Sequence, residues 1–451
     1  MKWTILALVL LFFVADNKKE SYLSDRIPAY KDIEEIQRGL RSRNYFLRYL
    51  NDTIFTKSNA RQLILTKSES IHTFSFVRDT SINQSVAQLF DKCIPGDYPT
   101  RYQDPFTYCI FANLIEKVST VGQAITKEQE QPRFGTIFDN SLNAEKISLK
   151  NVYLLLINSR LTSFSHQSGK AALQPILIQY DPQDSNFIAF GLDHGEIDSV
   201  INGDKAIKEN FLYTMLEFHY LNMPPNDSLK LAYVYFEKAL SYWNNSFEDF
   251  LLGHEFAHQL LHHNRSRKPD ADFNNLDSWY QEVAADSLSQ LILDTIVLSN
   301  ANDQNQIGWN KYLLMGGKFL LTTLGVYERS VSIIESNREI KSATEQEMNS
   351  ILELFDWNIP FEERLRKFKT LPDEIRKADH PPVEARLELL DRVAKKVLEQ
   401  KLHTRQDFND VEDLHYSLAS SMLYGIQEMY NLSLNGIFNA YRQRNQLEQY
   451  K

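Results

Sequence analysis

Three residues of types that take part in metal chemistry lie together in the segment His254-Glu255-Phe256-Ala257-His258. In a helix, residues four apart lie on the same face one turn apart, so the imidazoles of His254 and His258 can converge on one ion. Glu255 lies about 100° further round the helix, where its carboxylate can take a proton from a water molecule on that ion. The chain has 11 histidines, and random placement predicts roughly 0.02 such segments, so the spacing indicates a metal site.

A pair of acidic residues follows in the next predicted helix. Catalytic zinc sites use three protein ligands and leave a further position open for water. Glu282 and Asp286 lie one turn apart on one helical face, after a loop long enough for this helix to return to the first one. We expect Glu282 to be the third ligand and Asp286 to accept a hydrogen bond from the ring of His254, which fixes its orientation. The sequence therefore predicts one Zn²⁺ per chain, bound by His254, His258 and Glu282.

A third motif, His380-Pro381-Pro382, precedes another predicted helix, which carries Arg386. The two prolines prevent this helix from starting earlier and fix the direction of the chain before it. Two roles are open for the motif. His380 or Arg386 can face the metal and bind substrate or stabilise the oxyanion of a tetrahedral intermediate. Alternatively, Arg386 forms an ion pair with a carboxylate and braces its helix.

The combined motifs resemble a known group of enzymes. HExxH followed by ExxxD on the next helix resembles the gluzincin branch of zinc metallopeptidases, and GHEFAHQLLHH with QEVAADSLS looks like the HtpX and CAAX-protease group. HPPVEARL is similar to the HPP-x-E-x-R motif of that group, and Lit-type phage-exclusion peptidases are a neighbouring resemblance. The resemblance covers residues 245–395 and implies a zinc-dependent endopeptidase whose partner is a protein or peptide substrate. The HtpX group differs in its longer insertion before the third ligand and its multiple membrane-spanning helices.

The expected reaction is hydrolysis of a peptide bond. Zinc lowers the pKa of a bound water toward neutrality, and Glu255 takes the proton so that the oxygen can attack the scissile carbonyl. Glu255 then delivers the proton to the leaving amine. Two other interpretations stay open. One is a helical interaction module with structural zinc or no zinc, and the other is a hydrolase that cleaves one intracellular partner, as Lit-type peptidases do.

The helices and strands expected to position these residues indicate a mainly helical α+β fold. Runs rich in β-branched and aromatic residues predict strands at 71–77, 151–157, 175–180 and 187–190. Helical spacing predicts helices within 20–70 and at 247–264 and 277–298, the last two capped by Ser246 and Asp277 and joined by a loop at 265–276. We expect a small sheet in the N-terminal half and a helical zinc-binding C-terminal half. The predicted parts are a signal or anchor at 1–20, an α+β domain of unknown role at 21–200, a zinc metallopeptidase domain at 201–400 and a helical extension at 401–451.

The composition limits the partners and the compartment. The 451 residues include 49 Lys and Arg against 59 Asp and Glu, a net charge of −10, which argues against nucleic acid as a partner. The uncharged run at 3–15 is typical of an export signal and short for a membrane span. We therefore expect export or N-terminal membrane association, with a cytoplasmic location as the alternative. Cys93 and Cys109 either form a disulfide in an oxidising compartment or are unrelated thiols. The sequence leaves the oligomeric state open.

Overall fold

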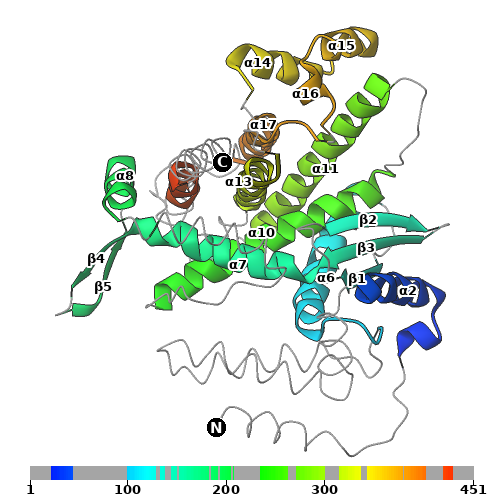
Figure 1. Cartoon of the computed structure of the whole chain (residues 1–451), viewed down its shortest axis with the longest axis horizontal. Helices are drawn as coiled ribbons and strands as arrows, with labels where there is room; N and C mark the ends of the chain where they lie inside the picture. The colour runs from blue at the N-terminus through cyan, green and yellow to red at the C-terminus, as the bar shows by residue number, and fades with distance from the viewer. Residues whose placement is uncertain are drawn as a thin grey trace, which may run out of the picture.

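The computed structural model of the chain describes residues 22–43, 99–127, 133–137, 144–149, 152–181, 184–190, 193–204, 207, 234–262, 271–299, 314–336, 343–378, 380–402 and 420–429. The described part is mostly helical with a small amount of β-sheet, which confirms the mainly helical α+β class (Figure 1). None of the helices in these ranges is long and apolar enough to cross a membrane. The predicted strand at 71–77, the predicted segment at 1–20 and Cys93 lie outside the described residues.

The elements follow one another along the chain in this order. They are the 3₁₀ helix η1 (Leu23–Asp25), α2 (Pro28–Arg43), α6 (Pro105–Thr126), β1 (Arg133–Ile137), β2 (Ala144–Leu149), β3 (Val152–Asn158), α7 (Ser159–Leu173), η2 (Gln174–Ile176), β4 (Leu177–Asp181), β5 (Asp184–Phe190), α8 (His194–Gly203), α10 (Val234–Leu260), α11 (Ala271–Ser299), α13 (Gly316–Ser336), α14 (Glu345–Leu354), α15 (Phe361–Phe368), α16 (Asp373–Arg376) and α17 (Val383–Leu402). A further helical segment covers 420–429.

The described strands form two small sheets. In the first sheet β3 is the middle strand, with β1 parallel to it on one side and β2 antiparallel to it on the other. Residues 154–157 of β3 are all buried, as is typical of a strand that is covered on both faces. The strands β4 and β5 form an antiparallel pair. The strands predicted at 151–157, 175–180 and 187–190 are therefore confirmed as β3, β4 and β5, with shifted ends.

The helix α10 lies at the centre of the helical part. It packs against α11, α6, α7 and α13, and α17 packs against α11 and α13 (Figure 1). Apolar side chains of these helices are buried in a continuous core that extends along the chain from Tyr22 to Met429. This core draws on residues from both sides of the predicted boundary at 200. The division into a sheet half and a helical half, and the four predicted parts, stay predictions.

The helices α10 and α11 approach each other closely at Gly253. A β-carbon added to Gly253 would lie 2.4 Å from Ser289 Oγ, so a larger residue would push the helices apart. Ser289 Oγ donates a hydrogen bond to the Phe250 carbonyl across the same contact, at 2.8 Å. Glu282 lies two turns earlier on α11. The close contact therefore fixes the distance at which Glu282 faces α10.

The starts of both helices differ from the prediction. α10 extends well before Ser246, whose hydroxyl donates a hydrogen bond to the Tyr242 carbonyl instead of capping the helix. α11 begins at Ala271, so Asp277 lies inside it and residues 271–276 of the predicted loop are helical. Ser and Asp can bond within a helix as well as at its end, so residue type alone does not locate a helix start. The full burial of Leu276 explains why α11 continues toward its N-terminus.

The sequence pattern did not predict α6, α7, β1 or β2. In α7 the polar side chains Arg160, Ser165 and Ser168 are buried together with apolar ones. Its sequence therefore lacks the division into an apolar and a polar face that identifies an amphipathic helix. The strands β1 and β2 are short, and each pairs with the strongly apolar β3. Their conformation depends on this pairing more than on their own residues.

Candidate metal centre

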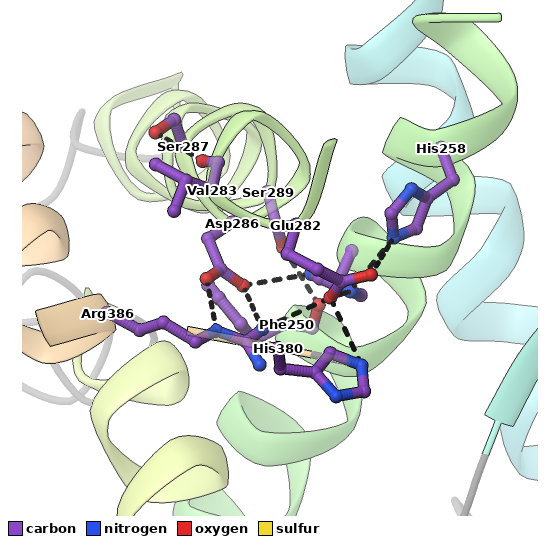
Figure 2. A network of polar contacts seen from close by, with 10 residues as sticks. Phe250, His258, Glu282, Val283, Asp286, Ser287, Ser289, His380 and Arg386 are labelled. Carbon is purple, nitrogen blue, oxygen red and sulfur yellow. Dashed lines mark hydrogen bonds and ion pairs between the residues drawn. The ribbon is translucent and has the colours of Figure 1, made fainter. Parts of the chain in front are cut away.

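The predicted metal ligands come together where α10 and α11 pack against each other (Figure 2). His254 and His258 project from one face of α10, and their Nε2 atoms lie 3.2 Å apart. Glu282 on α11 faces both rings, with Oε2 3.3 Å from His254 Nε2 and Oε1 3.5 Å from His258 Nε2. The three side chains are largely buried, and their ligand atoms all lie within 4.8 Å of one another. This group can hold a metal ion.

The separations of these atoms fit a tetrahedral ion. Zinc bonds to nitrogen and oxygen are about 2.0–2.2 Å long, so two ligand atoms of a tetrahedral site lie about 3.3–3.6 Å apart. The three observed separations are 3.2, 3.3 and 3.5 Å. Three protein ligands also leave a coordination position for water in a tetrahedral site. The residue types and the distances therefore both suit Zn²⁺.

Arg386 binds Asp286 (Figure 2), and Asp286 in turn contacts the ring of His254. Asp286 Oδ1 lies 2.9 Å from His254 Nδ1, which directs the opposite nitrogen of the ring toward Glu282. Arg386 on α17 donates two hydrogen bonds to the same carboxylate, from Nε at 2.7 Å and from Nη2 at 2.8 Å. Arg386 thus makes the ion pair with a carboxylate that the bracing alternative requires, and it links α17 to the site.

Burial and charge act against each other in this cluster. Burial lowers the pKa of His254, but its contacts with Asp286 and Glu282 outweigh burial and raise that pKa to about 10. Burial raises the pKa of Glu282, but the contact with His254 and the charges of Arg386 and His380 bring it well below its usual range. The pKa of Asp286 is lowered against its burial chiefly by Arg386. Without a metal ion these contacts favour ionised carboxylates and a protonated His254 imidazole, and a metal ion would displace that proton.

Two further residues predicted to take part in the site are Glu255 and His380. Glu255 directly follows His254 on α10, and its side chain is buried. His380 lies in the segment that precedes α17, with Nε2 3.6 Å from Glu282 Oε2 and a side chain that is 55% exposed. The structure therefore brings an imidazole from a distant part of the chain to the solvent-accessible side of the group.

Gly253 and Ser289 set the distance between α10 and α11, and no pattern in the sequence paired these two residues. Ser289 lies one turn after Asp286 on α11, and Gly253 immediately precedes His254. A small residue at each of these positions is the signal that would have indicated a close helix contact. The contacts of Arg386 had no comparable signal, because Asp286 is distant in sequence.

No family model, curated protein or solved structure matches this chain. The site is therefore judged from its own geometry, and the resemblance to zinc metallopeptidases stays a prediction.

Proposed function

We propose that the protein is a zinc-dependent endopeptidase. The observation that carries this proposal is the triangle formed by His254 Nε2, His258 Nε2 and the Glu282 carboxylate, with separations of 3.2–3.5 Å. Glu255 directly follows His254 on the same helix. Structural zinc sites usually have four protein ligands, whereas three ligands and an adjacent carboxylate are typical of hydrolytic zinc sites.

The surrounding residues have separate roles in the proposed reaction. When bound, Zn²⁺ supplies a Lewis acid that polarises the scissile carbonyl and lowers the pKa of a coordinated water to about 7. Glu255 takes the proton of the attacking water and delivers it to the leaving amine. His380 donates a hydrogen bond to the carbonyl oxygen as that oxygen becomes negative. Asp286 keeps His254 in the orientation that the metal requires.

The small sheet supports an extended polypeptide as the substrate. α10 packs against β2 and β3, and among the described strands β2 pairs with β3 alone. An extended peptide can add to the edge of a sheet through backbone hydrogen bonds, and on β2 it would run beside the helix that carries HExxH. Recognition through the backbone suits an endopeptidase, because it does not depend on the ends of the substrate.

The state of Cys109 supports export. Cys109 on α6 is buried and disulfide-bonded, and Cys93 is the other cysteine of the chain. Disulfides persist mainly in oxidising compartments. We therefore favour an exported or N-terminally anchored peptidase over a cytoplasmic enzyme that cleaves one partner.

His380 also supports a second candidate, a structural zinc site in a helical interaction module. Its Nε2 atom lies 3.6 Å from Glu282 Oε2, which is close to the separation of two tetrahedral ligands. A fourth protein ligand would close the site to water. The two candidates differ in what His380→Ala does, because an oxyanion donor leaves zinc binding intact and a fourth ligand does not.

Zinc content and peptide hydrolysis together test the proposal. We expect one zinc per chain in the wild type and in Glu255→Gln, and loss of zinc in His258→Ala. Hydrolysis of a quenched fluorescent peptide library should fall at least about 100-fold in Glu255→Gln. In His380→Ala, full zinc with slower hydrolysis supports the peptidase, whereas loss of zinc supports the structural site. A wild type that binds no zinc after reconstitution, or a Glu255→Gln variant with wild-type turnover, overturns the proposal.

A further inference from the structure

The segment 376–378, called the anchored segment below, is attached to the N-terminal half of α11. Asn275 Nδ2 donates a hydrogen bond to the Arg376 carbonyl at 3.1 Å. Trp279 Nε1 donates a hydrogen bond to the Ala378 carbonyl at 2.9 Å. The Arg376 side chain also binds Asp272, with Nη1 2.6 Å from Oδ1. Three residues of one helix therefore bind Arg376 and Ala378, which shortly precede His380.

Trp279 is the most firmly held of these anchors. Its side chain is fully buried in a second core cluster, which is formed by α11 together with α14, α15, α17 and the residues beside them. Its ring meets Phe368 edge to face, with ring centroids 5.1 Å apart. A buried indole N–H needs an acceptor, and here the acceptor is the carbonyl two residues before His380. The packing of the ring thus fixes the position of that carbonyl.

The chain after His380 is fixed as well. Pro381 is buried, and two backbone hydrogen bonds to the Pro382 carbonyl begin α17. Arg386, one turn further on, holds Asp286 with two hydrogen bonds. His380 is therefore an exposed imidazole between two attachments to α11, and α11 is also the helix that carries Glu282.

We infer that Trp279 is a positioning residue for peptide hydrolysis that acts through His380. Its indole N–H holds the Ala378 carbonyl so that the imidazole stays beside the metal ligands on the side open to substrate. The inference rests on the proposed peptidase function and on the role of His380 in it. It also gives the helices α14 to α16 a role, because their side chains pack around the Trp279 ring and hold it in place.

Kinetics of Trp279→Phe test this inference. The variant keeps an aromatic ring and removes the N–H, so kcat should fall roughly tenfold through misplacement of His380, with KM and zinc content unchanged. His380→Ala alone should lower kcat by about 100-fold. Adding Trp279→Phe to His380→Ala should lower kcat no further, because the two residues act as a unit. Additive losses in the double variant, or wild-type kcat in Trp279→Phe beside a defective His380→Ala, overturn the inference.

Tyr280→Phe is the matched control. Tyr280 packs in the same cluster, but its hydroxyl donates to the Leu354 carbonyl at 2.7 Å and not to the anchored segment. This variant should keep wild-type kcat. Asn275→Ala is a second test that leaves the aromatic core intact, and it should also lower kcat with unchanged zinc content.

Hydrogen exchange of the peptide 376–382 gives a readout that does not depend on catalysis. Exchange should be faster in Trp279→Phe than in the wild type and unchanged in Tyr280→Phe. Unchanged exchange in Trp279→Phe overturns the anchoring role even where the wild type hydrolyses peptides. A wild type that loads zinc and hydrolyses nothing overturns the proposed function instead, and the role of Trp279 in catalysis falls with it.

Discussion

Asp286→Asn is expected to weaken zinc binding and to destabilise the fold, for two separate reasons. The carboxylate lies 2.9 Å from His254 Nδ1 on one side and accepts two hydrogen bonds from Arg386 on the other. Asn has nearly the same shape, but its amide carries no charge and presents one oxygen instead of two. The ring of His254 then loses its charged partner, and the buried guanidinium of Arg386 loses its nearest carboxylate, since that of Glu282 lies further away at 3.7 Å.

The magnitude of each effect follows from these contacts. Loss of the partner that orients a ligand histidine typically lowers metal affinity about 10- to 100-fold, which is about 1.4–2.7 kcal/mol. Breaking a buried ion pair by removing one partner costs about 3–5 kcal/mol, because the other charge stays buried. The remaining contact between Arg386 and Glu282 puts the expected loss at the lower end, about 3 kcal/mol.

Two measurements separate the effects. Zinc affinity is measured by competition with a chelator of known affinity, and the free energy of unfolding is measured by urea titration of metal-free protein. In the double variant Asp286→Asn with Arg386→Met, the unpaired charge is gone, so most of the stability should return while zinc affinity stays low. Glu388→Gln is the control, because Glu388 pairs with Arg392 on the same helix at 3.2 Å with both side chains at least 50% exposed. It should change neither quantity by more than about 0.5 kcal/mol.

Zinc affinity in Asp286→Asn that stays within about twofold of the wild type would refute the argument that Asp286 orients His254. Recovery of zinc affinity in the double variant would show instead that the misplaced Arg386 charge, and not the lost carboxylate, disturbs the site.

Three further predictions follow from other contacts. Gly253→Ala should lower the free energy of unfolding in urea by about 1–3 kcal/mol, because the new β-carbon would lie 2.4 Å from Ser289 Oγ. Gly39→Ala is the control and should not destabilise the protein, because a β-carbon there meets no atom within 4 Å. Burial, and secondarily the charge of Asp249, raises the pKa of Glu248 from 4.5 to about 8. The folded state therefore binds this proton more tightly than the unfolded state, so the free energy of unfolding should fall by up to about 1.4 kcal/mol per pH unit as pH rises from about 4.5 to about 8. Glu248→Gln should remove this part of the pH dependence, and an unchanged slope would contradict the assignment. Chelation of zinc should lower the melting temperature of the wild type, and a metal-independent melting temperature would count against a site that binds zinc in the folded state alone.

The group that can hold a metal ion was predictable from sequence because the geometry of its two histidines is local. Residues four apart on a helix share a face whatever surrounds them, so His254 and His258 could be paired without any knowledge of the fold. Glu282 and Asp286 followed from the same periodicity on the next helix. The mainly helical class and the strands β3 to β5 were also evident, because their apolar runs are long or strongly β-branched. The true starts of α10 and α11 were not, because Ser246 and Asp277 bond inside helices that tertiary packing extends.

Only the tertiary structure decided how these helices form one site. Gly253 against Ser289 sets the distance at which Glu282 meets the two histidines, and that contact joins residues with no fixed relation in sequence. The choice between the two roles of Arg386 likewise depends on α17 packing against α11, which brings its guanidinium to the Asp286 carboxylate. The anchoring of the chain before His380 by Trp279 has no sequence signal, because a buried tryptophan finds its acceptor wherever packing leaves a carbonyl. Spacing along one helix is set by backbone geometry, whereas the approach of distant segments is set by side-chain packing throughout the core. This is why the His254, His258 and Glu282 group was predictable and the contacts that support it were not.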